Sequence, residues 1–197
     1  MYSEEVGSLT RQIEQVVATI DATHEKMRPT FFEVTTALAW LCFEQTQVDI
    51  AVLEVGLGGR LDSTNLCVPE VCVITTISKD HTEVLGDQLS QIAVEKAGII
   101  KPQVPIVCGV TSAAVQETIA KIARERDAPL IQIGRDLTFD ITSAELDRTE
   151  LTIRSDRSLV KSSQNSDSLD EFSASIPLPL PGSPQAHTAA CSLAAIP

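Results

Sequence analysis

The 197-residue sequence lacks several features that identify common protein classes. Its five cysteines include no CxxC pair and are too few for a disulfide-rich secreted scaffold: Cys42, Cys67, Cys72, Cys108 and Cys191. No apolar run approaches the about 18 residues that span a membrane, and no basic segment followed by an apolar one opens the chain. We therefore expect a soluble, cytoplasmic protein with reduced cysteines.

Positive charge is also scarce. The chain has 15 Lys and Arg against 27 Asp and Glu, which gives a net charge of −12. Nucleic acids and anionic membranes need clustered Lys and Arg, so neither is expected as a partner. A phosphate-binding loop GxxxxGK[ST] is missing as well, because no glycine is followed by lysine. The 43% of hydrophobic residues is nevertheless enough for the core of one large domain.

Apolar spacing predicts an α/β fold. Amphipathic helices are expected over residues 9–20 and 34–42, and short apolar runs then alternate with helical patterns. Such alternation is typical of a mostly parallel, doubly wound sheet with helices on both faces. The strands are expected at residues 50–55, 71–77, 106–108 and 130–133, with helices at 88–97 and 113–126.

The pattern changes near Asp136. Short, alternating, Thr-rich segments such as LTFDIT and ELTIRS predict a small antiparallel β addition. Between Ser155 and Ser175 lie eight serines, a composition that predicts a mobile loop. We therefore divide the chain into an α/β part, residues 1–135, and residues 136–197 with the β addition, the Ser-rich loop and a terminal helix.

The stretch EVGLGGRLDSTN, residues 54–65, predicts one wall of a ligand site, because closely spaced glycines let the backbone approach a ligand. Ligands of parallel sheets bind at the carboxyl ends of strands, so Glu54 should face the same crevice as Asp80 and His81, which follow the next strand. A carboxylate and an imidazole there could hold a divalent metal or act as acid and base. Alternatively, Glu54 accepts backbone hydrogen bonds in its own turn and Asp80 caps the next segment.

Lys96 falls on the apolar face of the predicted helix 88–97, for which Asp87 is the expected N-cap. It shares one stripe with four apolar residues, Leu89, Ile92, Ala93 and Ile100. An inward lysine is explained by a snorkelling stem, by an ion pair with Glu54, or by a role in a site. Spacing does not separate these explanations.

Four stretches follow one another along the chain: FFEVTTALAWLCF, VDIAVLEVGLGGRLDSTN, VITTISKDHTEVLGD and IAVEKAGIIKPQVPIVCG. In this order and at these separations they resemble the central domain of folylpolyglutamate synthase and dihydrofolate synthase, members of the Mur ligase superfamily. The resemblance runs without a gap over residues 29–109 and more weakly to the end. It implies an ATP-dependent ligase that phosphorylates a folate carboxylate, after which the amine of L-glutamate displaces phosphate from the acyl phosphate.

The resemblance also implies site residues by position. Glu54 and His81 would bind Mg²⁺, and Lys96 would be the lysine that the family carbamylates. Carbamylation turns a cation into a carboxylate-like group, which accounts for a lysine directed at a metal. Two stretches would bind the pterin ring, and their residues are Thr30, Phe31, Phe32, Glu33, Leu61, Asp62 and Ser63.

The sequence departs from the family pattern in several places. The phosphate loop is expected upstream of Met1, and a C-terminal domain that completes the ATP site is expected after Pro197. Thr188 stands where Asn is usual, Pro184 where His is usual, and Lys79 where an apolar residue is common. We therefore expect a central-domain fragment that is inactive and marginally stable alone, and that a polypeptide with the phosphate loop would complement.

Two other functions stay open. A non-catalytic remnant would bind a pterin or a partner weakly, and a dinucleotide-binding oxidoreductase would use the glycines that follow a strand. The second alternative lacks the usual GxGxxG spacing. The sequence also leaves open whether dihydropteroate, tetrahydrofolate or both serve as the substrate.

Overall fold

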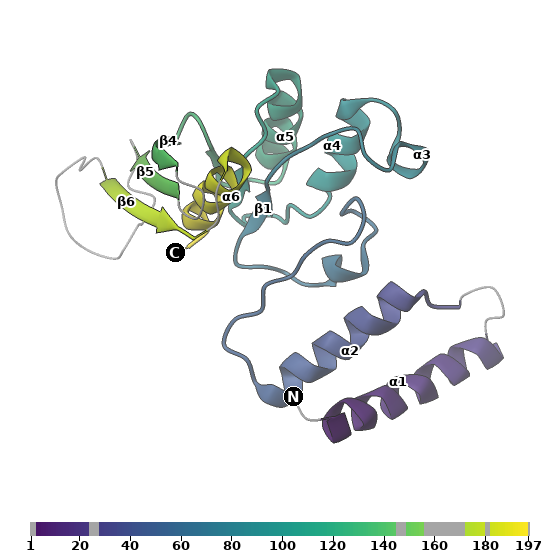
Figure 1. Cartoon of the computed structure of the whole chain (residues 1–197). Coiled ribbons are helices and arrows are strands. Elements are labelled where there is room, and N and C mark those ends of the chain that lie inside the picture. Colours follow the sequence, from purple (N-terminus) through teal and green to yellow (C-terminus); the bar gives the residue numbers. More distant parts are fainter. Residues whose placement is uncertain (1–2, 24–27, 145–148, 156–171, 180–181, 197) are drawn as a thin grey trace. The chain divides into compact units, whose positions relative to one another are not determined.

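The computed structural model describes residues 3–23, 28–144, 149–155, 172–179 and 182–196, and the chain divides into two compact units (Figure 1). Unit 1 is Met1–Cys67 and unit 2 is Val68–Pro197. The described part of unit 1 has only helices and loops, whereas both sheets belong to unit 2. No helix within the described ranges is long and apolar enough to cross a bilayer.

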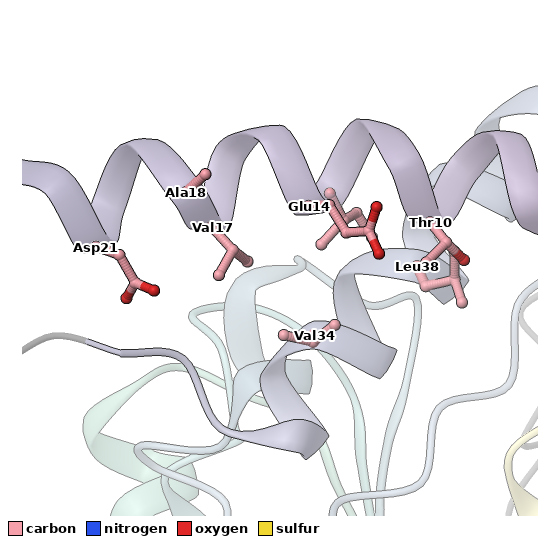
Figure 2. A pocket seen from close by; sticks show the side chains of 8 residues that line it. Thr10, Glu14, Val17, Ala18, Asp21, Val34 and Leu38 are labelled. Atoms are coloured by element: carbon pink, nitrogen blue, oxygen red, sulfur yellow. The ribbon is translucent and has the colours of Figure 1, made fainter.

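Unit 1 is built on two helices, which confirms both predicted helices. α1 spans Ser3–Thr23 and contacts α2, which spans Phe31–Thr46. α2 begins at a capping box, in which the Glu33 N–H donates to Thr30 Oγ1 at 3.2 Å and the Thr30 N–H donates to Glu33 Oε2 at 2.6 Å. It ends at Gln47, whose φ of 47° is left-handed. A groove lined by residues of both helices runs between them (Figure 2).

Residues 50–55 do not form the predicted buried strand. Ile50 and Val52 are 83% and 92% exposed. A strand exists only where a neighbour pairs with its N–H and C=O groups, and no described residue pairs with this segment. The apolar composition therefore indicates β propensity correctly, but the pairing that would bury the segment is not present.

Unit 2 contains a three-stranded parallel sheet in the order β1-β2-β3, which confirms the predicted alternation of strands and helices. The register places Cys72 opposite Ile106, and Ile106 opposite Leu130. Two helices, α3 and α4, connect β1 to β2, and α5 connects β2 to β3. The elements are β1 Cys72–Ile74, α3 Thr82–Leu85, α4 Leu89–Ala97, β2 Ile106–Cys108, α5 Ala113–Glu125 and β3 Leu130–Gln132.

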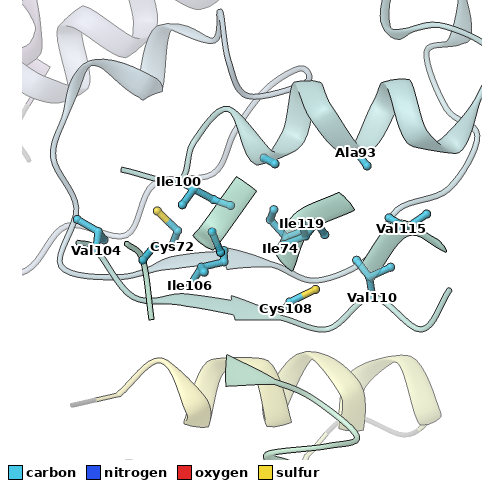
Figure 3. Close-up of a cluster of buried hydrophobic side chains, with 13 residues drawn as sticks. Cys72, Ile74, Ala93, Ile100, Val104, Ile106, Cys108, Val110, Val115 and Ile119 are labelled. Carbon is cyan, nitrogen blue, oxygen red and sulfur yellow. The ribbon is translucent and has the colours of Figure 1, made fainter. Parts of the chain in front are cut away.

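The central strand β2 is buried on both faces. Because side chains alternate along a strand, Ile106 and Cys108 belong to one apolar cluster with residues of α4 and α5, and Val107 belongs to a second cluster. Figure 3 shows the first cluster between the sheet and α4, with α6, Ser183–Ala194, across the sheet. α6 contributes the fully buried thiol of Cys191 to the second cluster.

The second sheet of unit 2 is antiparallel in the order β4-β5-β6, which confirms the predicted β addition. Its strands are β4 Leu137–Ala144, β5 Thr149–Ser155 and β6 Phe172–Leu178. Most of the predicted Ser-rich loop, residues 156–171, lies outside the described residues. Its last residues, 172–175, are part of β6, so the prediction of a loop is wrong there. The predicted terminal helix is α6.

Candidate functional site

The glycine-rich loop of unit 1 is closed by one carboxylate. Asp62 Oδ2 accepts hydrogen bonds from the N–H groups of Gly56 and Leu57 at 3.1 and 3.0 Å. Asp62 Oδ1 accepts from the N–H of Thr64 at 2.9 Å and from its hydroxyl. Asp62 is also the N-cap of a 3₁₀ turn, Ser63–Leu66. The two sides of the loop are therefore joined through a single side chain.

These hydrogen bonds favour the ionised form of Asp62. Partial burial alone would raise the pKa of its carboxyl group. Hydrogen bonds from the Thr64 hydroxyl and from the N–H groups of Leu57, Thr64 and Gly56 outweigh burial, and the pKa is lowered. The carboxylate, rather than the neutral acid, is therefore the form that holds the loop.

The same bonds decide between two interpretations of Glu54. The alternative in which Glu54 accepts the amides of its own turn is wrong, because the amides of Gly56 and Leu57 donate to Asp62. The Glu54 side chain is exposed and forms no hydrogen bond or ion pair with the described residues of unit 1. Its carboxylate oxygens remain available to a ligand.

Two of the glycines have structural reasons of their own. A Cβ atom on Gly56 would lie 2.6 Å from Cζ of Phe32, so only glycine lets the Phe32 ring pack on the loop. Gly58 has a φ of 65°, which glycine adopts without strain. The closely spaced glycines predict that a ligand approaches the loop backbone. At Gly56, the group that lies against the backbone is Phe32 of the protein's own α2 helix.

Of the seven residues predicted to bind a pterin, four have partners within unit 1. Thr30 and Glu33 form the capping box of α2, and Asp62 bonds within its loop. The Ser63 hydroxyl donates to Thr36 Oγ1 at 3.0 Å, which ties the 3₁₀ turn to α2. These side chains hold the walls of the predicted site in place.

The other three predicted residues are apolar and accessible. Phe31 is 84% exposed, Leu61 is 81% exposed, and Phe32 is 41% exposed with its ring against Gly56. Exposed apolar side chains of this size offer surface to a flat apolar ligand. Whether they contact a pterin stays a prediction.

A cavity of about 240 Å³ in unit 1 lies between α2 and residues 52–54. Trp40 Nε1 is buried there and has no acceptor among the described residues. Trp40 was not predicted from the sequence to line a cavity, although it is the only tryptophan of the chain and follows Phe32 and Thr36 at helical spacing. The lining residues are Phe32, Thr35, Thr36, Ala39, Trp40, Phe43, Val52, Leu53, Glu54 and Thr64.

In unit 2, His81 follows β1 in a left-handed conformation with φ 50° and is the N-cap of α3. Asp80 Oδ1 accepts the His81 N–H at 2.8 Å, and Asp80 Oδ2 lies 3.8 Å from His81 Nε2. Asp80 therefore orients His81 and does not cap α3, which corrects the alternative interpretation. The His81 side chain is 60% exposed and accessible to a ligand.

Lys96 lies at the edge of the buried face of α4 rather than in it. It is half-buried, and its ammonium group has no hydrogen bond or ion pair with the described residues of unit 2. The N-cap of α4 is Gln88 and not Asp87; its N–H donates to Gln91 Oε1 at 3.2 Å. The residues of α4 that are buried are Ile92, Ala93 and Ala97.

The three predicted metal ligands are divided between the units, Glu54 in unit 1 and the other two in unit 2. Glu54 offers the oxygen that Mg²⁺ prefers, and Lys96 would offer oxygen only as a carbamate. The imidazole of His81 suits zinc or iron better. Of the three predicted ligands, the two oxygen donors, Glu54 and carbamylated Lys96, therefore fit Mg²⁺. Among the described residues, no three His, Cys, Asp or Glu side chains are grouped to hold a metal.

Comparisons with known proteins agree with one another on the family. The model of the Mur ligase middle domain matches residues 4–196. The dihydrofolate synthase/folylpolyglutamate synthase of Bacillus subtilis (strain 168) is 45% identical over 127 residues, which are 64% of this chain and 29% of that protein.

Solved structures that match this chain include folylpolyglutamate synthases. A folylpolyglutamate synthase from Thermotoga maritima matches with a TM-score of 0.82 and 31% identity, covering 99% of this chain and 41% of that one. An FPGS–AMPPCP–folate complex matches with a TM-score of 0.78 and 29% identity, covering 95% of this chain and 43% of that one. The chain thus spans less than half the length of each of these relatives.

Proposed function

The chain belongs to the Mur ligase middle domain family, and from this membership we propose that it forms part of an ATP-dependent ligase that adds L-glutamate to folate or dihydropteroate. The observation that carries the proposal is the match of 99% of the chain to a folylpolyglutamate synthase at 31% identity. A neighbour described as a complex with AMPPCP and folate supports the same substrates.

The proposed reaction has two steps. The terminal phosphoryl group of ATP passes to the substrate carboxylate, which gives an acyl phosphate and ADP. The glutamate amine then attacks the acyl carbon, the C–O bond to phosphate breaks, and the amine loses a proton. Mg²⁺ bound by Glu54, His81 and carbamylated Lys96 would supply positive charge beside the transferred phosphoryl group.

The residues of unit 1 have two kinds of role in this proposal. Asp62 and the capping box of α2 act indirectly, by fixing the loop and the start of the helix. Phe31 and Leu61 contact the pterin ring, because they are exposed apolar side chains without a packing role in unit 1. Glu54 contributes a carboxylate that has no partner among the described residues of unit 1.

The 197-residue chain should bind a pterin but neither hydrolyse ATP nor ligate glutamate by itself, because it contains no GxxxxGK[ST] loop. A separate polypeptide that supplies this loop would complement it. The test measures folate-dependent ADP release by the purified chain, free of host ligase, and dihydropteroate and folate binding by calorimetry. Measurable turnover by the chain alone would contradict the expected inactivity.

Binding is tested with a matched pair of variants. Leu61→Asp places a charge on the proposed pterin surface and should abolish binding, whereas Val94→Asp on α4 of unit 2, where Val94 is 47% exposed, should leave binding unchanged. Loss of binding in both variants, or in neither, would reject the assignment of the pterin surface. Pterin binding without activity in the presence of a phosphate-loop polypeptide would favour the non-catalytic binding module.

A further inference from the structure

His187, on α6, lies where three other elements of unit 2 meet. Its Nε2 atom is 3.2 Å from the carbonyl oxygen of Thr75, the residue directly after β1. Its ring contacts Phe139 of β4 edge to face, with centroids 6.0 Å apart. Gly109, the residue directly after β2, lies against the same imidazole. The resemblance to the ligase family assigns no role to this histidine.

Gly109 makes room for the imidazole. Its N–H donates to the Ile74 carbonyl at 2.8 Å, which continues the pairing of β1 with β2. A Cβ atom at this position would lie 2.5 Å from His187 Nε2, 2.6 Å from Cys191 Sγ and 2.6 Å from the Thr75 oxygen. Any other residue would therefore force the His187 ring, the Cys191 side chain or the Thr75 carbonyl to shift.

The hydrogen bond to Thr75 determines where the ring carries a hydrogen. A carbonyl oxygen only accepts, so His187 Nε2 must carry the hydrogen, in either the neutral or the charged imidazole. The same bond anchors a segment that has few other polar contacts. Within residues 75–79, this is the one hydrogen bond to the described residues of unit 2, and Ile77 packs against the first apolar cluster.

The anchored segment leads directly to His81. Asp80 and His81 bond to each other through the His81 N–H, so this bond orients His81 only relative to its own neighbour. We propose that His187 is a positioning residue: through the Thr75 carbonyl it holds residues 75–81, and with them His81, at the carboxyl edge of the parallel sheet. The link from His81 to a metal rests on the proposed function, whereas the link from His187 to the segment does not.

¹⁵N relaxation of the purified chain tests the positioning. His187→Leu removes the donor and retains apolar volume, and the order parameters of the amides in residues 76–81 should fall from about 0.85 toward about 0.6. His187→Gln keeps an N–H group at a similar reach and should restore the higher values. Amides of α5 serve as the control and should not change. Equal order parameters in the Leu variant and the natural protein would overturn the proposal, as would an equal fall in both variants and in α5.

A second measurement needs no variant and decides the matter if His187→Leu fails to fold. The ¹⁵N signals of the imidazole distinguish the two neutral tautomers, and the proposal requires hydrogen on Nε2 of His187. A neutral ring protonated on Nδ1 would overturn it. Gly109→Ala adds an independent check, because it should lower the order parameters of residues 76–81 while the natural histidine is present.

Mn²⁺, a paramagnetic substitute for Mg²⁺, separates this proposal from the proposed function. With a phosphate-loop polypeptide bound, Mn²⁺ should broaden the ring signals of His81 in the natural protein and in His187→Gln, and less in His187→Leu. Absence of broadening in the natural protein would reject His81 as a metal ligand, and the relaxation experiment would still decide the role of His187.

Discussion

Unit 1 and unit 2 are stabilised by different interactions. Unit 2 encloses two apolar clusters, one on each face of its parallel sheet. In unit 1, none of the described residues of α2 is fully buried, and Phe31, Ile50 and Val52 are 84%, 83% and 92% exposed. Among the described residues of unit 1, the buried apolar side chains are Leu9 and Ile13 of α1. Side-chain hydrogen bonds at Thr30 and Asp62 also order this unit. Unit 2 therefore relies more on apolar burial, and unit 1 relies more on polar contacts.

The starts of the helices show the same contrast. Thr30 accepts the Glu33 amide at the start of α2. Ser112, the N-cap of α5, forms no such bond with a described residue, and α5 relies on buried Val115, Ile119 and Ala123. A helix with an apolar face in a core can begin without a strong cap, whereas α2 packs on α1 without a buried side chain of its own.

The largest effect is expected from supplying unit 1 with a partner. Exposed apolar residues with few buried ones predict that the chain alone is aggregated, oligomeric or partly molten. Co-expression with a polypeptide that carries the phosphate loop should give a defined complex with a more cooperative thermal transition, measured by size-exclusion chromatography and circular dichroism. A clean monomer with a sharp two-state transition, unaffected by that polypeptide, would show that unit 1 needs no partner.

The second-largest effect is expected from truncating a buried side chain, compared with an exposed one. Ile106→Ala in β2, at a fully buried site, should lower the free energy of unfolding of unit 2 by about 2 to 5 kcal/mol. Ile50→Ala in unit 1, where the side chain is 83% exposed, is the matched control and should change stability by no more than about 0.5 kcal/mol. Urea denaturation measures both. Equal losses would mean that residue 50 is packed in solution and that the contrast between the units is false.

A smaller effect is expected at Asp62 and depends on pH. The folded-state pKa is lowered, so the carboxylate contributes its full stabilisation above the unfolded value of about 3.9 and loses it as the pH falls through the folded pKa. NMR titration of the Gly56, Leu57 and Thr64 amides should show a shared midpoint below about 3.9. Asp62→Asn should abolish this transition and cost about 1 kcal/mol at neutral pH. A midpoint at or above the unfolded value would contradict the hydrogen-bond network.

The smallest effect separates the two kinds of helix start. Thr30→Ala removes the capping box of α2 and should cost about 1 kcal/mol of local stability. Ser112→Ala should cost α5 only a few tenths, roughly 0.3 kcal/mol, because no side-chain bond is lost. Hydrogen exchange of the first-turn amides of both helices provides the measurement. A larger loss at Ser112 would reverse the comparison.

Elements with a complete apolar pattern of their own could be predicted from the sequence. The ends of β2 agree with the prediction, and both sheets have the predicted strand directions. Whether residues 50–55 form a strand could not be decided from the sequence, because strand formation depends on a pairing partner that local sequence does not specify. β6 was missed because its sequence FSASIPL begins inside the Ser-rich composition.

The site shows a similar limit. The position after a predicted strand identified His81, and the resemblance to the family identified Asp62. Their partners depend on backbone conformation, such as the left-handed φ of His81. Lys96 was predicted to lie on the buried face of its helix, but the residue buried beside Ile92 and Ala93 is its neighbour Ala97. In a helix of nine residues, the border of an apolar stripe is not fixed by periodicity alone.

Buried thiols lie on both sides of the parallel sheet, so the reactivity of the natural cysteines can report local unfolding of unit 2. Burial raises the pKa of Cys191 to about 11 and also raises the pKa of Cys108. The thiolate is the form that attacks an alkylating reagent, so these sulfurs are protected both by inaccessibility and by their bound proton. Cys42 and Cys67, in unit 1, are only half-buried and can react in the folded chain. Alkylation of Cys108 and Cys191 therefore reports the opening of unit 2, without any introduced label.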